Sequence, residues 1–404
     1  MAMKILHTAD WHLGKKLDRF SRLEEQTEVL EEIIQIADSK NIDIVVIAGD
    51  LFDTFNPPTE AVDLFYKTLK RLSKNGKRPV VAISGNHDSP NFIDAPNPLA
   101  RECGIILIGQ PNAIVPLLEL QDFSVTKSEE GFIEIQLKKE DFPIRIFHTA
   151  YANEVRLKTY FGENKEDELN TILKEKWKNI SEKHADSNGV NLLMTHLYMN
   201  KKGAEILEEP DGEKPLKIGN ADMVFSDAIP QNIQYTALGH LHGFRNIGSA
   251  EKPVVYASSP LCYSFSEAGQ TKFVSIIDAQ PNQTVTYEKK ALQSGKKLER
   301  KSFKTVDEAI LWLNENPKTW VELTMETDTF LKAEERKLLY QSHSGIVYLI
   351  PKVKNVAQLE TSVKEINLSQ KTEELFADYF KSKNNGLAPN DDLMNLFKEI
   401  ENLS

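Results

Sequence analysis

The chain has 404 residues, of which 40% are hydrophobic and 27% are charged, and its formal net charge is −11. This length exceeds what one hydrophobic core normally organises, so we expect two or three domains of an ordinary soluble protein. The acidic balance argues against broad non-specific adhesion to nucleic acid, although a local basic face could still bind it.

Three further features indicate a cytoplasmic protein. No segment approaches the ~18 uninterrupted apolar residues of a membrane span. The chain runs into a strand at Met3, so no signal peptide is expected before it. The two cysteines, Cys103 and Cys262, are too few for a disulfide framework.

Apolar runs and helical patterns alternate over residues 1–280, which is typical of layered α/β proteins. The predicted buried strands are Met3–Thr8, Ile42–Ala48, Val80–Ser84, Gly104–Ile108, Ile144–Thr149, Val190–Thr195, Ile233–Leu238, Val254–Ala257 and Lys272–Asp278. A capping box at Ser21–Glu24 is expected to open one helix, and a second helix is expected from Thr59 to about Ser73.

Five polar clusters directly follow predicted strands and carry metal-ligand side chains. They are Asp10-Trp11-His12, Gly49–Asp53, Gly85-Asn86-His87-Asp88, Thr195-His196 and Gly239-His240-Leu241-His242. Loops at the carboxyl ends of strands are where sites assemble in α/β sheets, so residues remote in sequence can converge there. Carboxylate, imidazole and amide ligands together suit a pair of Mn-like cations, the usual centre for breaking a phosphate ester.

Single histidines are more often core or surface residues than ligands. His196 alone would be better explained as a core histidine, and we keep that interpretation for His7 and His148, which lie in apolar runs. We expect His184 and His343, in polar stretches, at the surface. The shared position of the five clusters at strand ends is what favours a metal site.

The pattern changes after Gln280. Strands at Lys297–Phe303, Trp320–Met325 and Gly345–Ile350 alternate with helices that begin at Thr305 and Ala333. We therefore predict four parts: a domain over 1–280, a small α/β domain over 285–353, a linker over 354–370 and a tail of two amphipathic helices over 371–404. The tail helices either dock on a partner or pack back onto the chain. The basic run from Lys289 to Lys304 is either a nucleic-acid contact or a solvated charged face.

The order Asp-x-His, Gly-Asp-x-x-Asp, Gly-Asn-His-Asp, His and Gly-His-x-His resembles the calcineurin-like metallophosphoesterase superfamily. That resemblance implies a layered β-sandwich flanked by helices. The long form, with a small capping domain and a helical tail, is similar to bacterial DNA nuclease subunits of this superfamily. Two further stretches, Tyr235–His242 and Ser258–Gly269, also look like those subunits rather than like phosphatases.

The resemblance implies two Mn²⁺ ions and assigns their ligands by matching position. Asp10, His12, Asp50 and His242 would hold one ion. Asp50, Asn86, His196 and His240 would hold the other, with Asp50 bridging. His87 would be the catalytic histidine with Asp88 behind it, and Asp53 would brace a ligand or a loop.

The resemblance also implies DNA as substrate, cut by 3′→5′ double-strand exonuclease and single-strand or hairpin endonuclease activity in DNA end processing, repair, recombination and replication. The partner would be an SMC-like ATPase with a long coiled coil, in a two-plus-two assembly. The small domain would cap the DNA path, and the tail would bind the base of the coiled coil. The helix at Thr59–Ser73 and the segment Pro90–Glu102 would pair two nuclease subunits.

Two rival functions stay open at this point. A phosphatase or phosphodiesterase for small substrates would use the same five clusters, because these define the reaction centre and not the substrate. What distinguishes it is the long extension after Gln280, which a small-substrate enzyme does not need. The second rival, a non-catalytic scaffold, would not need ligand-competent residues in every cluster.

Overall fold

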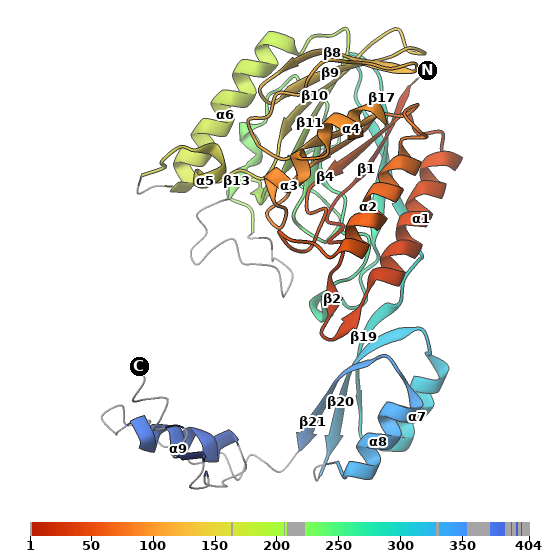
Figure 1. Cartoon of the computed structure of the whole chain (residues 1–404), viewed down its shortest axis with the longest axis vertical. Coiled ribbons are helices and arrows are strands. Elements are labelled where there is room, and N and C mark those ends of the chain that lie inside the picture. The colour runs from red at the N-terminus through yellow and green to blue at the C-terminus, as the bar shows by residue number, and fades with distance from the viewer. Residues whose placement is uncertain are drawn as a thin grey trace.

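The computed structural model describes residues 2–162, 165–205, 207, 223–328, 331–353 and 372–383, and the single positions 389, 393, 394 and 397. Two large sheets form the main body, and a small sheet with two helices stands at one end of it (Figure 1). No helix in the described part of the chain combines the length and hydropathy that a membrane span requires.

The first sheet has six strands in the order β18-β17-β1-β4-β5-β6. Their bounds are β1 Met3–Thr8, β4 Ile44–Ala48, β5 Val80–Ile83, β6 Ile105–Ile108, β17 Phe273–Ala279 and β18 Thr286–Ala291. Strands β1, β4, β5 and β6 are parallel, whereas β17 and β18 are antiparallel additions. The loops after β1, β4 and β5 therefore leave the sheet at one edge.

The second sheet has eight strands in the order β15-β16-β14-β11-β10-β9-β8-β7. Their bounds are β7 Leu118–Glu119, β8 Phe123–Glu129, β9 Phe132–Leu137, β10 Ile144–Thr149, β11 Val190–His196, β14 Tyr235–Gly239, β15 Arg245–Asn246 and β16 Val254–Tyr256. Strands β10, β11, β14 and β16 are parallel, so the ends of β11 and β14 also share one edge.

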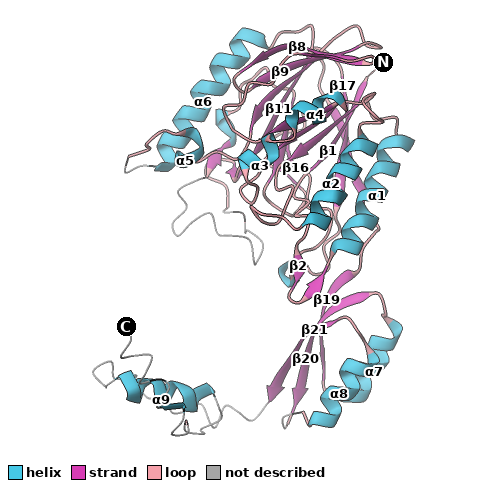
Figure 2. Ribbon diagram, viewed as in Figure 1, coloured by secondary structure: helices cyan, strands magenta, loops and turns pink. Residues whose placement is uncertain are grey.

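Along β1 and β4, successive side chains point to opposite faces of the sheet and therefore pack in two different hydrophobic cores. Ile5 and Val46 lie in the core between the sheets, while their neighbours Leu6 and Val45 pack against α1 (Leu23–Ser39) and α2 (Thr59–Leu72). On the far side α6 (Lys165–His184) covers the second sheet, with Trp177 buried against it. Figure 2 shows these helices on the two outer faces of the stacked sheets.

The small domain has a parallel three-stranded sheet in the order β19-β20-β21. Its elements are β19 Lys297–Phe303, α7 Val306–Glu315, β20 Thr319–Thr327, α8 Ala333–Ser342 and β21 Ile346–Val353. The Thr305 side chain caps α7 by accepting the Glu308 N–H, as its sequence predicts. Because β18 pairs with β17 in the first sheet, we place the start of the small domain at Lys297 rather than at residue 285.

The remaining elements are short, except for Thr372–Lys383, which is the first of the two predicted tail helices. They are β2 Lys16–Leu17, β3 Phe20–Ser21, α3 Pro90–Asp94, α4 Asn97–Glu102, α5 Glu154–Leu157, β12 Met199–Asn200, β13 Val224–Phe225, a 3₁₀ turn η1 at Ser226–Ala228, a second η2 at Phe265–Glu267, and α9 Thr372–Lys383. The nine predicted strands of the first 280 residues are confirmed within two residues at each end. The predicted linker and most of the second tail helix lie outside the described residues.

The predicted capping box at Ser21–Glu24 is wrong. Helix α1 has Arg22 at its N-cap and no side-chain cap. The Arg22 guanidinium instead bonds the Glu25 carboxylate, at 2.7 Å from Nε to Oε1. This pair is buried, and Glu25 also accepts the indole N–H of Trp320, so the start of α1 contacts the small domain.

Candidate metal centre

The five clusters converge where the two sheets meet. Loops after β1, β4 and β5 bring the first three clusters, and β11 and β14 of the other sheet end at the remaining two. All the predicted ligand side chains are buried: Asp10, His12, Asp50, Asn86, His196, His240 and His242. Residues up to 232 positions apart in sequence, Asp10 and His242, therefore line one site.

Asp50 lies at the centre of this group. Its Oδ2 is 3.5 Å from His12 Nε2 and 3.3 Å from His196 Nε2. Its Oδ1 accepts a hydrogen bond from the His87 N–H at 2.9 Å. One carboxylate oxygen thus sits between two separate sets of ligand-type side chains.

The first set consists of Asp10, His12 and His242. The Nε2 atoms of His12 and His242 are 3.0 Å apart, and Asp10 Oδ1 accepts the backbone N–H of His240 at 2.8 Å. Burial raises the pKa of Asp10 to about 7, although His196 and His242 act in the opposite direction. A cation at this carboxylate would offset the cost of burying its charge.

The second set consists of Asn86, His196 and His240. Asn86 Oδ1 is 2.9 Å from His196 Nε2 and 3.3 Å from His240 Nδ1. His196 Nδ1 donates to the Ala48 carbonyl at 2.8 Å, so Nε2 is the nitrogen that faces Asn86. Burial lowers the pKa of His196, but Asp50 and Asp10 raise it to about 9, so this corner attracts positive charge strongly.

Glycines allow the ligands to come this close. A Cβ on Gly85 would lie 2.1 Å from Asp50 Oδ1, and one on Gly49 would lie 2.2 Å from His196 Nδ1. Gly239 packs on the Ala48 carbonyl, 1.8 Å from where its Cβ would stand. The glycines before Asp50, Asn86 and His240 are therefore packing requirements of the site.

Several ligand-type residues have left-handed backbone conformations. The φ angles are +54° at Asp10, +43° at His12, +48° at Asp50 and +104° at His240. Such conformations are uncommon outside glycine, and they collect at functional sites where the surrounding fold can hold them. In this molecule they curl the strand ends so that each side chain turns inward.

The side chains fit a pair of divalent cations. The atoms of Asp10, His12 and Asp50, and those of Asp50, His196 and His240, form groups within 4.8 Å. The Oδ2 atoms of Asp10 and Asp50 are buried and accept no hydrogen bond from the described residues. Mixed carboxylate, imidazole and amide donors of this kind suit Mn-like ions.

His87 and Asp88 do not form the pair that their adjacency suggests. His87 Nδ1 donates to the backbone carbonyl of Asp53 at 2.9 Å. The Asp88 carboxylate accepts the N–H groups of Leu51, Phe52 and Gly85 at 2.8–3.0 Å, and so ties the Asp50 loop to the Asn86 loop. The sequence suggests that Asp88 orients His87 directly, but the structure shows that it anchors the Asp50 and Asn86 loops to each other.

Asp53, for which the sequence suggests a bracing role, lies beside His12 and His87, and ligand-type atoms of these three side chains also group within 4.8 Å. Its carboxylate is 3.0 Å from Lys15 Nζ and 3.6 Å from His12 Nδ1. Burial would raise the pKa of Asp53, but His12 and Lys15 lower it to about 2. Asp53 thus stays ionised beside His12, while its backbone carbonyl holds His87.

Of the four other histidines, His7 and His148 lie where the sequence predicts, whereas His184 and His343 do not. His7 and His148 are core residues, as predicted, and burial lowers the pKa of each to about 3. The surface placement predicted for His343 is wrong, because it is 5% exposed and bonds the Asn316 carbonyl. His184 stacks on Phe132 with ring centroids 4.1 Å apart, so it is not a free surface residue either.

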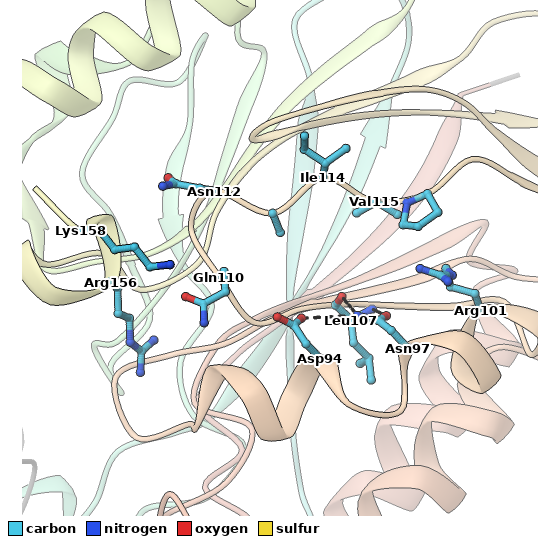
Figure 3. A pocket seen from close by; sticks show the side chains of 12 residues that line it. Asp94, Asn97, Arg101, Leu107, Gln110, Asn112, Ile114, Val115, Arg156 and Lys158 are labelled. Atoms are coloured by element: carbon cyan, nitrogen blue, oxygen red, sulfur yellow. Dashed lines mark hydrogen bonds between the residues drawn. The ribbon is translucent and has the colours of Figure 1, made fainter.

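Arg156 is a site residue that the sequence did not reveal. From α5 it donates to the carbonyls of Gly85 at 2.9 Å and Asp88 at 2.7 Å, and to Ser84 Oγ at 3.2 Å. It thereby holds both ends of the loop that carries Asn86 and His87. Arg156 also lines a cavity of about 480 Å³ with Lys158 (Figure 3).

The basic run is partly engaged by the chain itself. Lys289 lies over the rings of Phe244 and Phe273, and Lys296 lies 4.3 Å from the ring centroid of Trp320. Arg300 forms an ion pair with Glu322 at 2.9 Å. The ion pair offsets one positive charge of the run, while the ring contacts fix where Lys289 and Lys296 lie.

A family model of calcineurin-like phosphoesterases matches residues 3–243, a range that contains all five clusters. The chain is 34% identical to the D component of the SbcCD nuclease of Bacillus subtilis, over 98% of this chain and 97% of that protein. It is 31% identical to the same component from Staphylococcus epidermidis, over 70% of this chain and 67% of that protein. A solved dimetal phosphatase from Danio rerio matches at 11% identity and a TM-score of 0.39, over 72% of this chain and 99% of that one, which is too remote to support a conclusion. The chain belongs to the calcineurin-like phosphoesterase family and, within it, to the SbcD group of SbcCD nuclease components.

Proposed function

We propose that the chain is the DNA nuclease component of an SbcCD-type complex and hydrolyses DNA phosphodiesters with two Mn²⁺ ions. The activities would be 3′→5′ exonuclease on double strands and endonuclease on single strands and hairpins, in DNA end processing, repair and recombination. The observation that carries the proposal is the position of Asp50 Oδ2, within 3.5 Å of ring nitrogens from two ligand sets. The names of both relatives support nuclease activity.

The two ligand sets would each hold one ion. Asp10, His12 and His242 would share the first with Asp50, and Asn86, His196 and His240 would share the second with it. When bound, such ions activate a water and neutralise charge on the phosphoryl oxygens. The protein's own contribution is to hold the ligands in place before substrate arrives.

His87 would exchange a proton with the departing oxygen of the phosphodiester. Its Nδ1–H is committed to the Asp53 carbonyl at 2.9 Å, so the exchange takes place at Nε2. Asp88 keeps the His87 loop at a fixed distance from the Asp50 loop through its three backbone bonds. The His87 ring would therefore be oriented before the reaction begins, and no free energy would be spent on reorienting it.

The partner would be an SbcC-type SMC-like ATPase, with two copies of each protein in the assembly. Helix α2 and the segment that contains α3 and α4 would pair two nuclease subunits, and Leu99 of α4 is 74% exposed there. The tail that contains α9 would bind the coiled-coil base. Within the described part of the tail, the rings of Phe376 and Phe397 stack with centroids 4.2 Å apart.

The test is Mn²⁺-dependent cleavage of an end-labelled hairpin duplex, with and without the SbcC-type ATPase. The Asp50→Ala protein, purified in the same way, measures any contaminating nuclease. Cleavage that requires Mn²⁺ and rises with the ATPase is expected. If DNA stays intact while a small phosphodiester is turned over, the metal centre stands and the function moves to a small-substrate phosphoesterase.

A further inference from the structure

Glu267 contacts the ring of His242 from outside the site. It lies in η2, within the Ser258–Gly269 stretch, and is 2% exposed. Its Oε1 is 3.3 Å from His242 Nδ1, on the side of the ring opposite to His12. A carboxylate that accepts the Nδ1–H of a ligand histidine fixes its tautomer and its orientation.

Glu267 is itself held rigidly. Its Oε1 accepts the backbone N–H groups of Tyr263 at 3.0 Å and Ser264 at 3.1 Å. Its Oε2 pairs with Lys272 Nζ, which also donates to the His242 carbonyl at 2.8 Å. The ring and the backbone carbonyl of His242 are therefore both bonded to the Glu267–Lys272 pair.

The same turn receives the small domain on its other side. Phe265, two residues before Glu267, is buried in a cluster with Leu298, Trp320 and Val347. These three residues come from β19, β20 and β21, so every strand of the small sheet contributes to the contact. One short turn thus touches a metal ligand and the docking face of the small domain.

A second connection runs through the start of α1. Glu25 accepts Trp320 Nε1–H and the Lys296 backbone N–H, both at 2.7 Å. The next residue, Gln26, donates to the His12 carbonyl at 2.8 Å. Both connections therefore lead from the small domain to the ligand set that contains His12 and His242.

The other ligand set is held differently. His196 bonds the Ala48 carbonyl of β4, and Asn86 stands on a loop that Arg156 and Asp88 fix. These supports come from the main body of the molecule.

We propose that Glu267 is a positioning residue for His242, and that docking of the small domain through Phe265 and Trp320 sets the affinity of the ion held with His12 and His242. Displacing the small domain lowers the affinity for this ion and leaves the other ion in place. The inference rests on the proposed function, because it requires these side chains to bind metal.

The test is calorimetric titration of Mn²⁺ into the full-length chain. The wild type is expected to show two binding events. Glu267→Gln and Phe265→Ala are expected to weaken one event by about 10- to 100-fold and to leave the other within about twofold. Trp320→Phe keeps an aromatic ring in the cluster but removes the bond to Glu25, and it is expected to weaken the same event. Leu311→Ala, at a position on α7 that is 64% exposed, is the matched control and should change neither event.

Thermal unfolding identifies any variant that fails to fold. If Phe265→Ala does not fold, Trp320→Phe still tests the effect of docking. Two unchanged events in Glu267→Gln would overturn the positioning role. Unchanged events in folded Phe265→Ala and Trp320→Phe, or equal weakening of both events, would overturn the coupling to the small domain. A wild type that binds no Mn²⁺ would instead overturn the proposed function.

Discussion

The two halves of the candidate metal centre are supported in different ways. In one half, Asn86 and His196 depend on the backbone of the two sheets and on Arg156. In the other half, His12 and His242 depend on Gln26 and Glu267, whose sequence neighbours touch the small domain. The first half is thus as rigid as the sheets, while the second can respond to a neighbouring domain.

The largest expected effect is the loss of both halves at once. Asp50→Ala removes the carboxylate that lies between them, so we expect both Mn²⁺ binding events to disappear. Cleavage should fall by on the order of 10³-fold or more, because the reaction centre is lost. Calorimetry and the hairpin assay measure the two effects, with Glu182→Ala on the exposed face of α6 as control. One event of full affinity in Asp50→Ala would show that this residue does not bridge.

The next effect separates chemistry from metal binding. His87→Gln removes the proton-exchanging ring but none of the proposed ligands, so both Mn²⁺ events should persist. Cleavage should fall by roughly 10²- to 10⁴-fold, the range for a lost general acid. Loss of one Mn²⁺ event would instead show that His87 is a ligand, and would add it to one of the two halves.

Arg156→Ala tests the half that is supported by the sheets. Without the guanidinium, the carbonyls of Gly85 and Asp88 lose a partner, which should cost about 1–3 kcal/mol of stability. We expect weaker binding at the Asn86 ion and a kcat lower by about tenfold, with KM for DNA nearly unchanged. Lys158 lines the same cavity, and Lys158→Ala should leave Mn²⁺ affinity as it is. Weakening of the His242 ion in Arg156→Ala would contradict the separation of the two halves.

The smallest effect concerns the half that is connected to the small domain. Gln26→Ala removes one neutral hydrogen bond to the His12 carbonyl, worth about 1 kcal/mol. The ion held with His12 should therefore bind only a fewfold more weakly. Gln35→Ala, on the exposed side of α1, serves as the control in the same titration. If only the ion held with Asn86 binds more weakly, Gln26 supports that ligand set and not the set that contains His12.

The convergence of the candidate ligand residues could be predicted from the sequence, because each stands close to the end of a strand. Asp10, Asp50 and Asn86 each follow an apolar run closely, and that pattern alone placed them at one edge. Their left-handed backbone could not be predicted, since neither Asp10 nor Asp50 is a glycine and the rest of the fold holds the strain.

The supporting residues were missed because they are distant in sequence. Arg156 acts on Asp88 across 68 positions, and no local pattern relates the two. Asp88 was paired with His87 because they are adjacent, whereas the partner of His87 Nδ1 comes from Asp53, 34 positions earlier. Glu267 had a signal in the Ser258–Gly269 stretch, but only the tertiary structure shows that it meets His242.

The crowding at Gly49, Gly85 and Gly239 has a consequence for protein engineering. A methyl group at any of these positions would overlap an atom that the site needs, at separations of 1.8–2.2 Å. A designer who grafts only the seven candidate ligand side chains onto another scaffold would therefore fail to reproduce the arrangement. The three glycine positions must be transferred as well, because this arrangement depends on the absence of a side chain at each of them.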